Sequence, residues 1–201
     1  DEGMKTHTDL PEHIYVRIED GKQVAIYYSD SKGRMLDKYD NSGLDLVNSG
    51  LDLVEGIIVI EKAETWQGSG GIKAGNCAGA WIVAAVEADQ GWGPLLYDIA
   101  MEWATINGNG LVPDRHDVSP AARKVWNYYF NNRSDVKNNQ LDDLQNTLTE
   151  PKGDNCDQRS ASDPGNKEPN RTNWKNSPLS KIYTKQPTII GQLKKENKLI
   201  L

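Results

Sequence analysis

The feature that most constrains the fold is a junction where a long apolar run meets a glycine pair and then a helical pattern. The run, CAGAWIVAAVEA at 77–88, is the most apolar segment of the chain and predicts a strand in the centre of a sheet. Gly91-Trp92-Gly93 follows, and then Pro94, which suits a first helical position because its missing N–H needs no partner there. We therefore predict a central strand, a tight turn and a helix beginning near Gly93.

The segment after Gly93 carries apolar residues at helical spacing, which predicts an amphipathic helix. Asp98 and Glu102 fall outside the apolar stripe, so we place them on the polar side of this helix. The stripe consists of Leu95, Leu96, Ile99, Ala100, Trp103 and Ala104.

The rest of the chain predicts further strands and helices around this junction. Alternating segments at 13–19 and 23–30 flank Asp20-Gly21, the chemistry of a hairpin turn. Ser119 and Pro120 predict the N-cap and first turn of a second helix. We expect an α+β (mixed α/β) fold with a central, mostly antiparallel sheet flanked by helices. Other strands are predicted at 56–66, 111–115 and 180–188, and a short helix over 187–201.

A change of composition near residue 150 suggests two regions. Residues 150–201 begin with a polar stretch rich in Asn, Asp, Pro and Gly, which predicts an irregular extension that ends in the short helix. We assign the folded domain to 10–149. Within it the sequence NSGLDLV occurs at 41–47 and again at 48–54; one such duplication is too short for a solenoid.

Composition excludes several classes of function. The net charge of -6 and a pI near 5.1 argue against nucleic-acid or anionic-membrane binding. No apolar run reaches bilayer length, and the first residues show no basic-then-apolar segment, so secretion is not expected. Cys77 and Cys156 form no metal motif, so no metal site is expected; reduced thiols are the expectation, with one disulfide left open.

The glycine junction has the physical properties of an anion site. First-turn amides of a helix lack intrahelical partners and carry the positive end of the helix dipole. Glycines before them let a ligand approach the backbone, which suits a pyrophosphate. The alternative is a simple strand-to-helix turn. A dinucleotide GxGxxG motif is not present because Leu96 occupies its third glycine position.

Two motifs in order resemble the GNAT superfamily of acyl-CoA-dependent N-acyltransferases. In that family a central strand ends in [Q/R]-x-x-G-x-[G/A] before a helix, and Gly91-Trp92-Gly93-Pro94-Leu95-Leu96 resembles its second half. A second block, N-x-x-A-x-x-[aliphatic]-Y, is similar to SPAARKVW at 119–126. The resemblance covers roughly 13–135, and the residue pattern of the chain is similar to phage-encoded members. This resemblance implies a location in a host cytoplasm or a phage virion.

The resemblance implies an acetyl-CoA-dependent N-acetyltransferase acting on an amine or protein substrate. The acyl arm would lie along the central strand and the pyrophosphate on the amides of the junction. Catalytic candidates are Tyr128, Tyr129 and Glu87, with Glu61 and Glu64 as further candidate bases. The cofactor-binding candidates are Ala84, Val86, Gly91, Trp92, Gly93, Leu95 and Ser119.

Two other classes of function remain open. Ala88, Asp89 and Trp126 differ from the family pattern, which suits a catalytically degenerate GNAT-like fold serving as a virion, structural or host-interaction protein. The acidic composition suits an inhibitor that binds a host enzyme.

Overall fold

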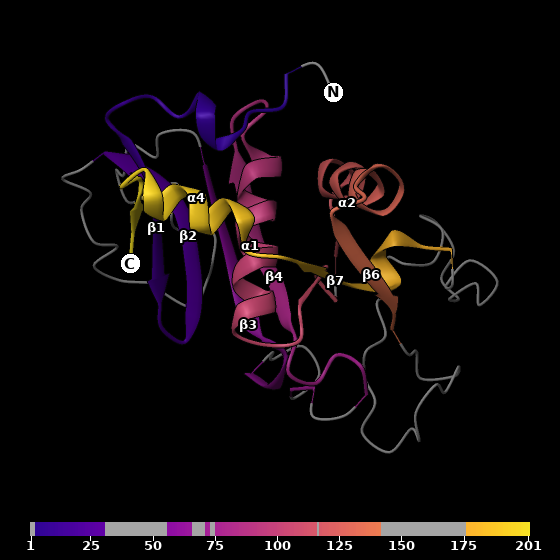
Figure 1. Ribbon diagram of the computed structural model, residues 1–201. Helices are drawn as coiled ribbons and strands as arrows, with labels where there is room; N and C mark the ends of the chain where they lie inside the picture. The colour runs from indigo at the N-terminus through magenta and orange to yellow at the C-terminus, as the bar shows by residue number, and fades with distance from the viewer. Residues whose placement is uncertain (1–2, 31–55, 66–70, 73–74, 116, 142–175) are drawn as a thin grey trace. The chain divides into compact units, whose positions relative to one another are not determined.

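The protein has a mixed α+β fold, as the sequence predicts (Figure 1). The computed structural model describes residues 3–30, 56–65, 71–72, 75–115, 117–141 and 176–201. The NSGLDLV duplication and Cys156 lie outside these residues. The helices are α1 (Gly93–Ile106), α2 (Pro120–Asn132) and α4 (Thr188–Lys195). The strands are β1 (Ile14–Asp20), β2 (Gln23–Asp30), β3 (Gly56–Lys62), β4 (Trp81–Ala88), β5 (Leu111–Val112), β6 (Val136–Gln140), β7 (Lys181–Lys185) and β8 (Leu199–Ile200).

Within the described residues, eight strands are hydrogen-bonded in the order β6-β7-β5-β4-β3-β2-β1-β8. The β1–β2, β5–β7 and β6–β7 pairs are antiparallel, whereas β4–β5 and β1–β8 are parallel. Two compact units are distinguished within the chain, and each is described by itself. The first comprises Asp1–Ile60, Ala84–Ala100 and Thr188–Leu201, and the second Glu61–Val83 and Met101–Pro187.

The first unit is built on the predicted β1–β2 hairpin. Ile14, Val16 and Ile18 alternate with more exposed residues along β1, because successive side chains of a strand point to opposite faces. β8 pairs with the same strand, where Val16 lies opposite Leu199. Lys198 supports this pairing through its ammonium group, which donates hydrogen bonds to the carbonyl oxygens of residues 11, 12 and 14.

The second unit places β7 between β5 and β6, with α2 formed as predicted. Ser119 is the N-cap of α2: its Oγ accepts a hydrogen bond from the amide of Ala122 at 3.2 Å, and Pro120 occupies the first turn. Trp126 on α2 is buried and packs on Tyr183 of β7, with ring centroids 4.9 Å apart. The predicted helix start and the late strand near residue 180 are therefore confirmed.

Two expectations from the sequence are wrong. Asp98 and Glu102 do not lie on a solvent-exposed face of α1, since their exposed fractions are 7% and 0%. The Glu102 carboxylate binds a buried cation instead of water, as described below. Reduced thiols were expected, but Cys77 is disulfide-bonded. The alternative of one disulfide was left open by the sequence.

Candidate functional site

The first part of the candidate site is the second half of β4. The β4–β5 ladder joins Trp81 to Leu111 and Ile82 to Val112, and no further β4–β5 rung occurs among the described residues. β5 is only two residues long, so residues 84–88 of β4 extend beyond it. Ala84 and Val86 are partly exposed there and Glu87 is exposed. The main chain of this half-strand has hydrogen-bonding capacity that β5 does not use.

The second part is the glycine junction between β4 and α1. Gly91 has a φ of +91°, a left-handed conformation that favours glycine. Trp92 is buried, its ring lies 5.2 Å from that of Tyr28, and its carbonyl oxygen accepts a hydrogen bond from the Tyr28 hydroxyl at 3.1 Å. The side chain and the main chain of Trp92 therefore both fix the junction against Tyr28.

Only part of the predicted amide set is available to a ligand. The Trp92 amide donates to the carbonyl oxygen of Asp89 at 3.1 Å, and Pro94 has no N–H. The Leu96 amide donates to the Trp92 carbonyl oxygen at 3.5 Å. Gly93 and Leu95 are the first-turn residues whose amides have no backbone acceptor among the described residues. An anion at this end of α1 would therefore meet two amides.

The amino-terminal segment lies against the same junction. The Lys5 amide donates to the carbonyl oxygen of Gly91 at 3.0 Å. A Cβ at Gly91 would stand 2.0 Å from the carbonyl oxygen of Gly3, whereas a Cβ at Gly93 would meet its nearest atom, the Ala88 Cβ, at 3.8 Å. The positive φ at position 91 and the nearby Gly3 carbonyl oxygen thus both require a glycine there, whereas Gly93 has room for a side chain.

The predicted tyrosines lie side by side near the end of α2. The ring of Tyr129 is 5.7 Å from that of Tyr128 in an edge-to-face arrangement. Tyr129 is fully buried, whereas Tyr128 is half-buried. The guanidinium carbon of Arg133 lies 5.1 Å from the Tyr129 ring centroid and 6.0 Å from that of Tyr128, within the range of a cation–π interaction. Of the two hydroxyl-bearing candidates, Tyr128 is the one with surface left for a ligand.

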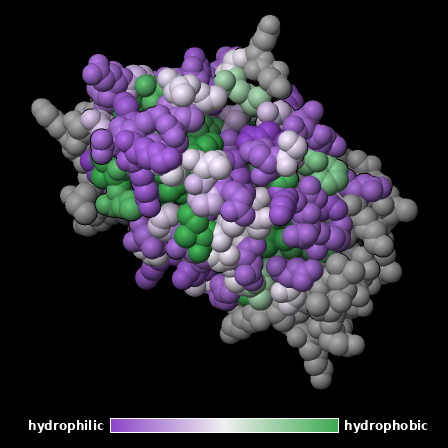
Figure 2. Space-filling model, viewed as in Figure 1, coloured by the Kyte–Doolittle hydropathy of each residue, from purple (hydrophilic) through white to green (hydrophobic). Residues whose placement is uncertain are grey.

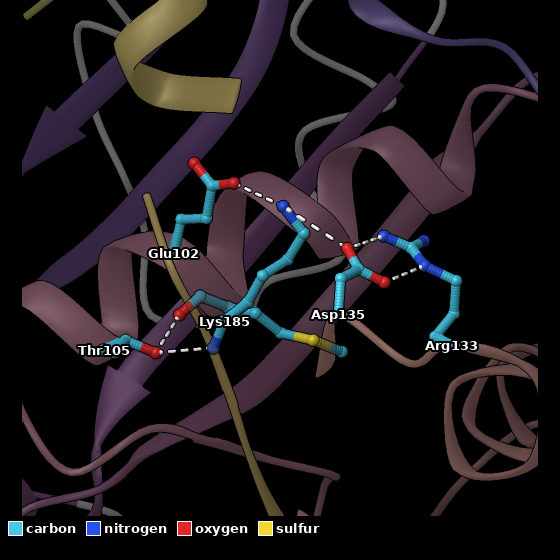
Figure 3. Close-up of polar contacts among 6 residues, drawn as sticks. Glu102, Thr105, Arg133, Asp135 and Lys185 are labelled. Carbon is cyan, nitrogen blue, oxygen red and sulfur yellow. Dashed lines mark hydrogen bonds and ion pairs between the residues drawn. The ribbon is translucent and has the colours of Figure 1, made fainter. Parts of the chain in front are cut away.

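A chain of alternating charges runs from the buried Glu102 through Lys185 and Asp135 to Arg133 (Figure 3). Glu102 on α1 accepts a hydrogen bond from the Lys185 ammonium, and these side chains are 0% and 3% exposed. The same ammonium lies 3.9 Å from Asp135 Oδ2. Asp135 accepts two hydrogen bonds of 2.7 Å from Arg133, which hold the pKa of its carboxyl group below the usual range.

Backbone contacts fix the position of Lys185 in this chain. Its amide donates to Thr105 Oγ1 at 3.0 Å, and the Thr105 hydroxyl donates to the Met101 carbonyl oxygen at 2.7 Å (Figure 3). The sequence did not predict this cluster of charged residues. One signal was available: Glu102 follows Ile99 by three residues, a spacing that places both on one side of a helix.

The sequence-predicted residues are divided between the two units. Ser119, Tyr128 and Tyr129 belong to the second unit. Those in the first unit are Ala84, Val86, Glu87, Gly91, Trp92, Gly93 and Leu95. Of the further candidate bases, Glu64 accepts a hydrogen bond from the Gly79 amide at 2.6 Å.

Comparisons of the chain with family models, with curated proteins and with solved structures give no match. Among the described residues, no helix combines the length and the apolar character that a membrane span requires.

Proposed function

We propose that the protein is an acetyl-CoA-dependent N-acetyltransferase with a GNAT-like fold. The observation that carries the proposal is the partial pairing of β4 with β5. The two parallel strands pair over two residues only, and β4 then leads into the glycine junction and α1. An extended ligand with amide groups suits such a strand, because it can bond to the main chain that β5 does not reach, as an added strand would.

The residues take the following roles in this proposal. The pantetheine arm of acetyl-CoA bonds to the main chain near Ala84 and Val86, and its pyrophosphate bonds to the amides of Gly93 and Leu95. The acceptor amine attacks the thioester carbonyl, with Glu87 as the base that takes its proton. The departing thiolate takes a proton from solvent in this proposal, and Tyr128 and Tyr129 stay predictions from the resemblance. The acceptor, a small amine or a protein, and the phage origin stay predictions.

Three observations favour a second candidate, a catalytically degenerate GNAT-like fold with a virion, structural or host-interaction role. The Trp92 amide already has a partner in Asp89. The Ser119 hydroxyl oxygen caps α2. Trp126 stands at the position where the resemblance expects a tyrosine, and it is buried. The visible face in Figure 2 is mostly hydrophilic, so a protein that bound the degenerate form on this face would contact a polar surface.

Turnover distinguishes the two candidates. The protein is incubated with acetyl-CoA and a panel of polyamines, amino acids and lysine-containing peptides, and release of the CoA thiol is followed. The first candidate predicts amine-dependent release that falls at least tenfold in Glu87→Gln, a loss of about 1.4 kcal/mol of transition-state stabilisation. Lys124→Met, an exposed change on α2, is the control and keeps full activity. Release that no amine increases would favour the second candidate.

A further inference from the structure

β6 is an edge strand of the second unit. It pairs with β7 on one side, and among the described residues no strand lies on its other side (Figure 1). An edge strand of this kind carries main-chain N–H and C=O groups that its one neighbour cannot use. A strand from another molecule can pair with such groups, so the state of this edge determines whether the protein can associate through it.

Two contacts show which residues of β6 direct their main chain away from β7. The Leu141 amide donates to the Ser180 carbonyl oxygen at 2.9 Å, which is a bond toward β7. Gln140, one position earlier, has a carbonyl oxygen that accepts a hydrogen bond from the side chain of Asn76 instead. Hydrogen-bonded and non-hydrogen-bonded pairs alternate along antiparallel strands. The outward residues of β6 are therefore Val136, Asn138 and Gln140.

The start of β6 agrees with this assignment. Lys185 lies opposite Val136, and its amide donates to Thr105 Oγ1 at 3.0 Å and not to β6. The outward amide of Val136 donates to the Arg133 carbonyl oxygen at 3.4 Å. The protein itself thus supplies a partner for one outward group at each end of the strand, the N–H of Val136 and the C=O of Gln140.

Asn138 is the outward residue between these two ends. Its main-chain N–H and C=O have no partner among the described residues. A second copy of β6, antiparallel and with Asn138 opposite Asn138, would satisfy both groups, because residues in a hydrogen-bonded pair exchange both bonds. This register places Lys137 opposite Asn139 of the second copy. Pairing Val136 with Asn138 would instead place two copies of Lys137 opposite one another, which is unfavourable.

Asn76 occupies one position of that pairing. Its Nδ2 donates to the Gln140 carbonyl oxygen at 3.2 Å, and in the register centred on Asn138 this oxygen would meet the Val136 amide of the second copy. Asn76 is exposed and lies 64 positions before Gln140. Both residues belong to the second unit. The contact therefore closes the edge of β6 at a point where a second copy would have to displace it.

We propose that the outer edge of β6 is a surface for antiparallel pairing with β6 of a second copy, and that the Asn76 side chain closes this surface. While Asn76 is in place, the open part of the edge is Asn138 alone, which is too short for a strand to pair with. Loss of the contact opens the edge as far as Gln140. The proposal concerns association and does not depend on acyl transfer.

The experiment compares Asn76→Ala and Asn76→Asp with the wild type in the full chain. Both changes remove the donor, and the second keeps the shape of the side chain. Sedimentation velocity is recorded from about 10 μM to about 1 mM protein, in about 0.5 M salt to screen the repulsion between chains of net charge -6. Both variants should dimerise at least tenfold more tightly than the wild type. Asn127→Ala, an exposed change on α2, is the control and behaves as the wild type does.

A second change in Asn76→Ala tests the register. Asn138→Pro removes the central donor of the pairing, but it leaves the β6–β7 bonds intact because this N–H points away from β7. Asn139→Lys places a lysine opposite Lys137 of the second copy, and it decides if the proline variant fails to fold. Each should weaken the dimer at least tenfold.

Three results would overturn the proposal. The first is an Asn76→Ala protein that melts at a lower temperature but does not associate, since Asn76 would then only fix its own loop. The second is a wild type that dimerises as tightly as Asn76→Ala. The third is a dimer that persists unchanged with Asn138→Pro and with Asn139→Lys.

Discussion

Lys185 on β7 donates a hydrogen bond from its ammonium to Glu102 on α1, although the two residues are 83 positions apart and both side chains are almost completely buried. Transfer of these charges out of water is unfavourable, and their mutual attraction offsets that cost only while both are present. The pair therefore links two elements at a site where either residue alone would be destabilising.

This relationship predicts a non-additive result in a double-mutant cycle. Lys185→Met leaves the Glu102 carboxylate buried without its cation and lowers the unfolding free energy by about 3–5 kcal/mol. Glu102→Leu has a similar effect, while the double variant recovers most of the loss. Urea unfolding measures all four proteins. Two single losses that simply add in the double variant would show that the pair does not act as a unit.

Asp135 predicts a pH-dependent contribution to stability. The Arg133 hydrogen bonds lower its pKa in the folded state from the ordinary 3.8, so its contribution is present above that value and is lost as the pH falls through the lower folded pKa. The melting temperature of Asp135→Asn should lie below that of the wild type at pH 7, and the gap should close below pH 3.8. Asp135 is about half exposed, so the gap is small. A constant gap from neutral to strongly acid pH would contradict this assignment.

Gly91 and Gly93 predict opposite responses to the same substitution. Gly91→Ala puts a Cβ 2.0 Å from the Gly3 carbonyl oxygen at a φ of +91°, which costs about 1–2 kcal/mol or more. Gly93→Ala meets nothing closer than 3.8 Å and leaves the unfolding free energy within about 0.5 kcal/mol. Chemical denaturation of both variants tests the geometry of the junction. Equal denaturation midpoints would refute it.

The disulfide bond at Cys77 predicts that this residue resists alkylation until the protein is reduced. It is fully buried and disulfide-bonded, so iodoacetamide should not modify it in denatured, unreduced protein. After reduction it should be modified completely, as the mass of its tryptic peptide reports. Modification without reduction would show a free thiol, in line with the original expectation from the sequence.

Local patterns allowed a large part of the fold to be predicted. The β1–β2 hairpin follows from alternation around Asp20-Gly21, and the start of α2 follows from Ser119 and Pro120. In each case the decisive residues are neighbours in the chain, so their physical chemistry is visible in the sequence.

Two strands and the charge chain were not predicted, because long-range contacts decide them. β6 reads Val-Lys-Asn-Asn-Gln and has little β propensity of its own; its pairing with β7 forms it. β8 follows the terminal helix and depends on β1. Glu102 is charged, and in its buried position it forms an ion pair with Lys185, which is distant in the sequence.

The most direct test of the proposed function is calorimetric titration with acetyl-CoA. The wild type is predicted to bind one molecule with saturation at submillimolar ligand, and Gly93→Ala to bind about tenfold more weakly, a change of about 1.4 kcal/mol, because its Cβ obstructs approach to the junction amides. Gly191→Ala on α4, whose Cβ would meet nothing within 4 Å, is the control and binds as the wild type does. No heat with wild-type protein at submillimolar acetyl-CoA, or equal affinity in all three proteins, would contradict the proposed site.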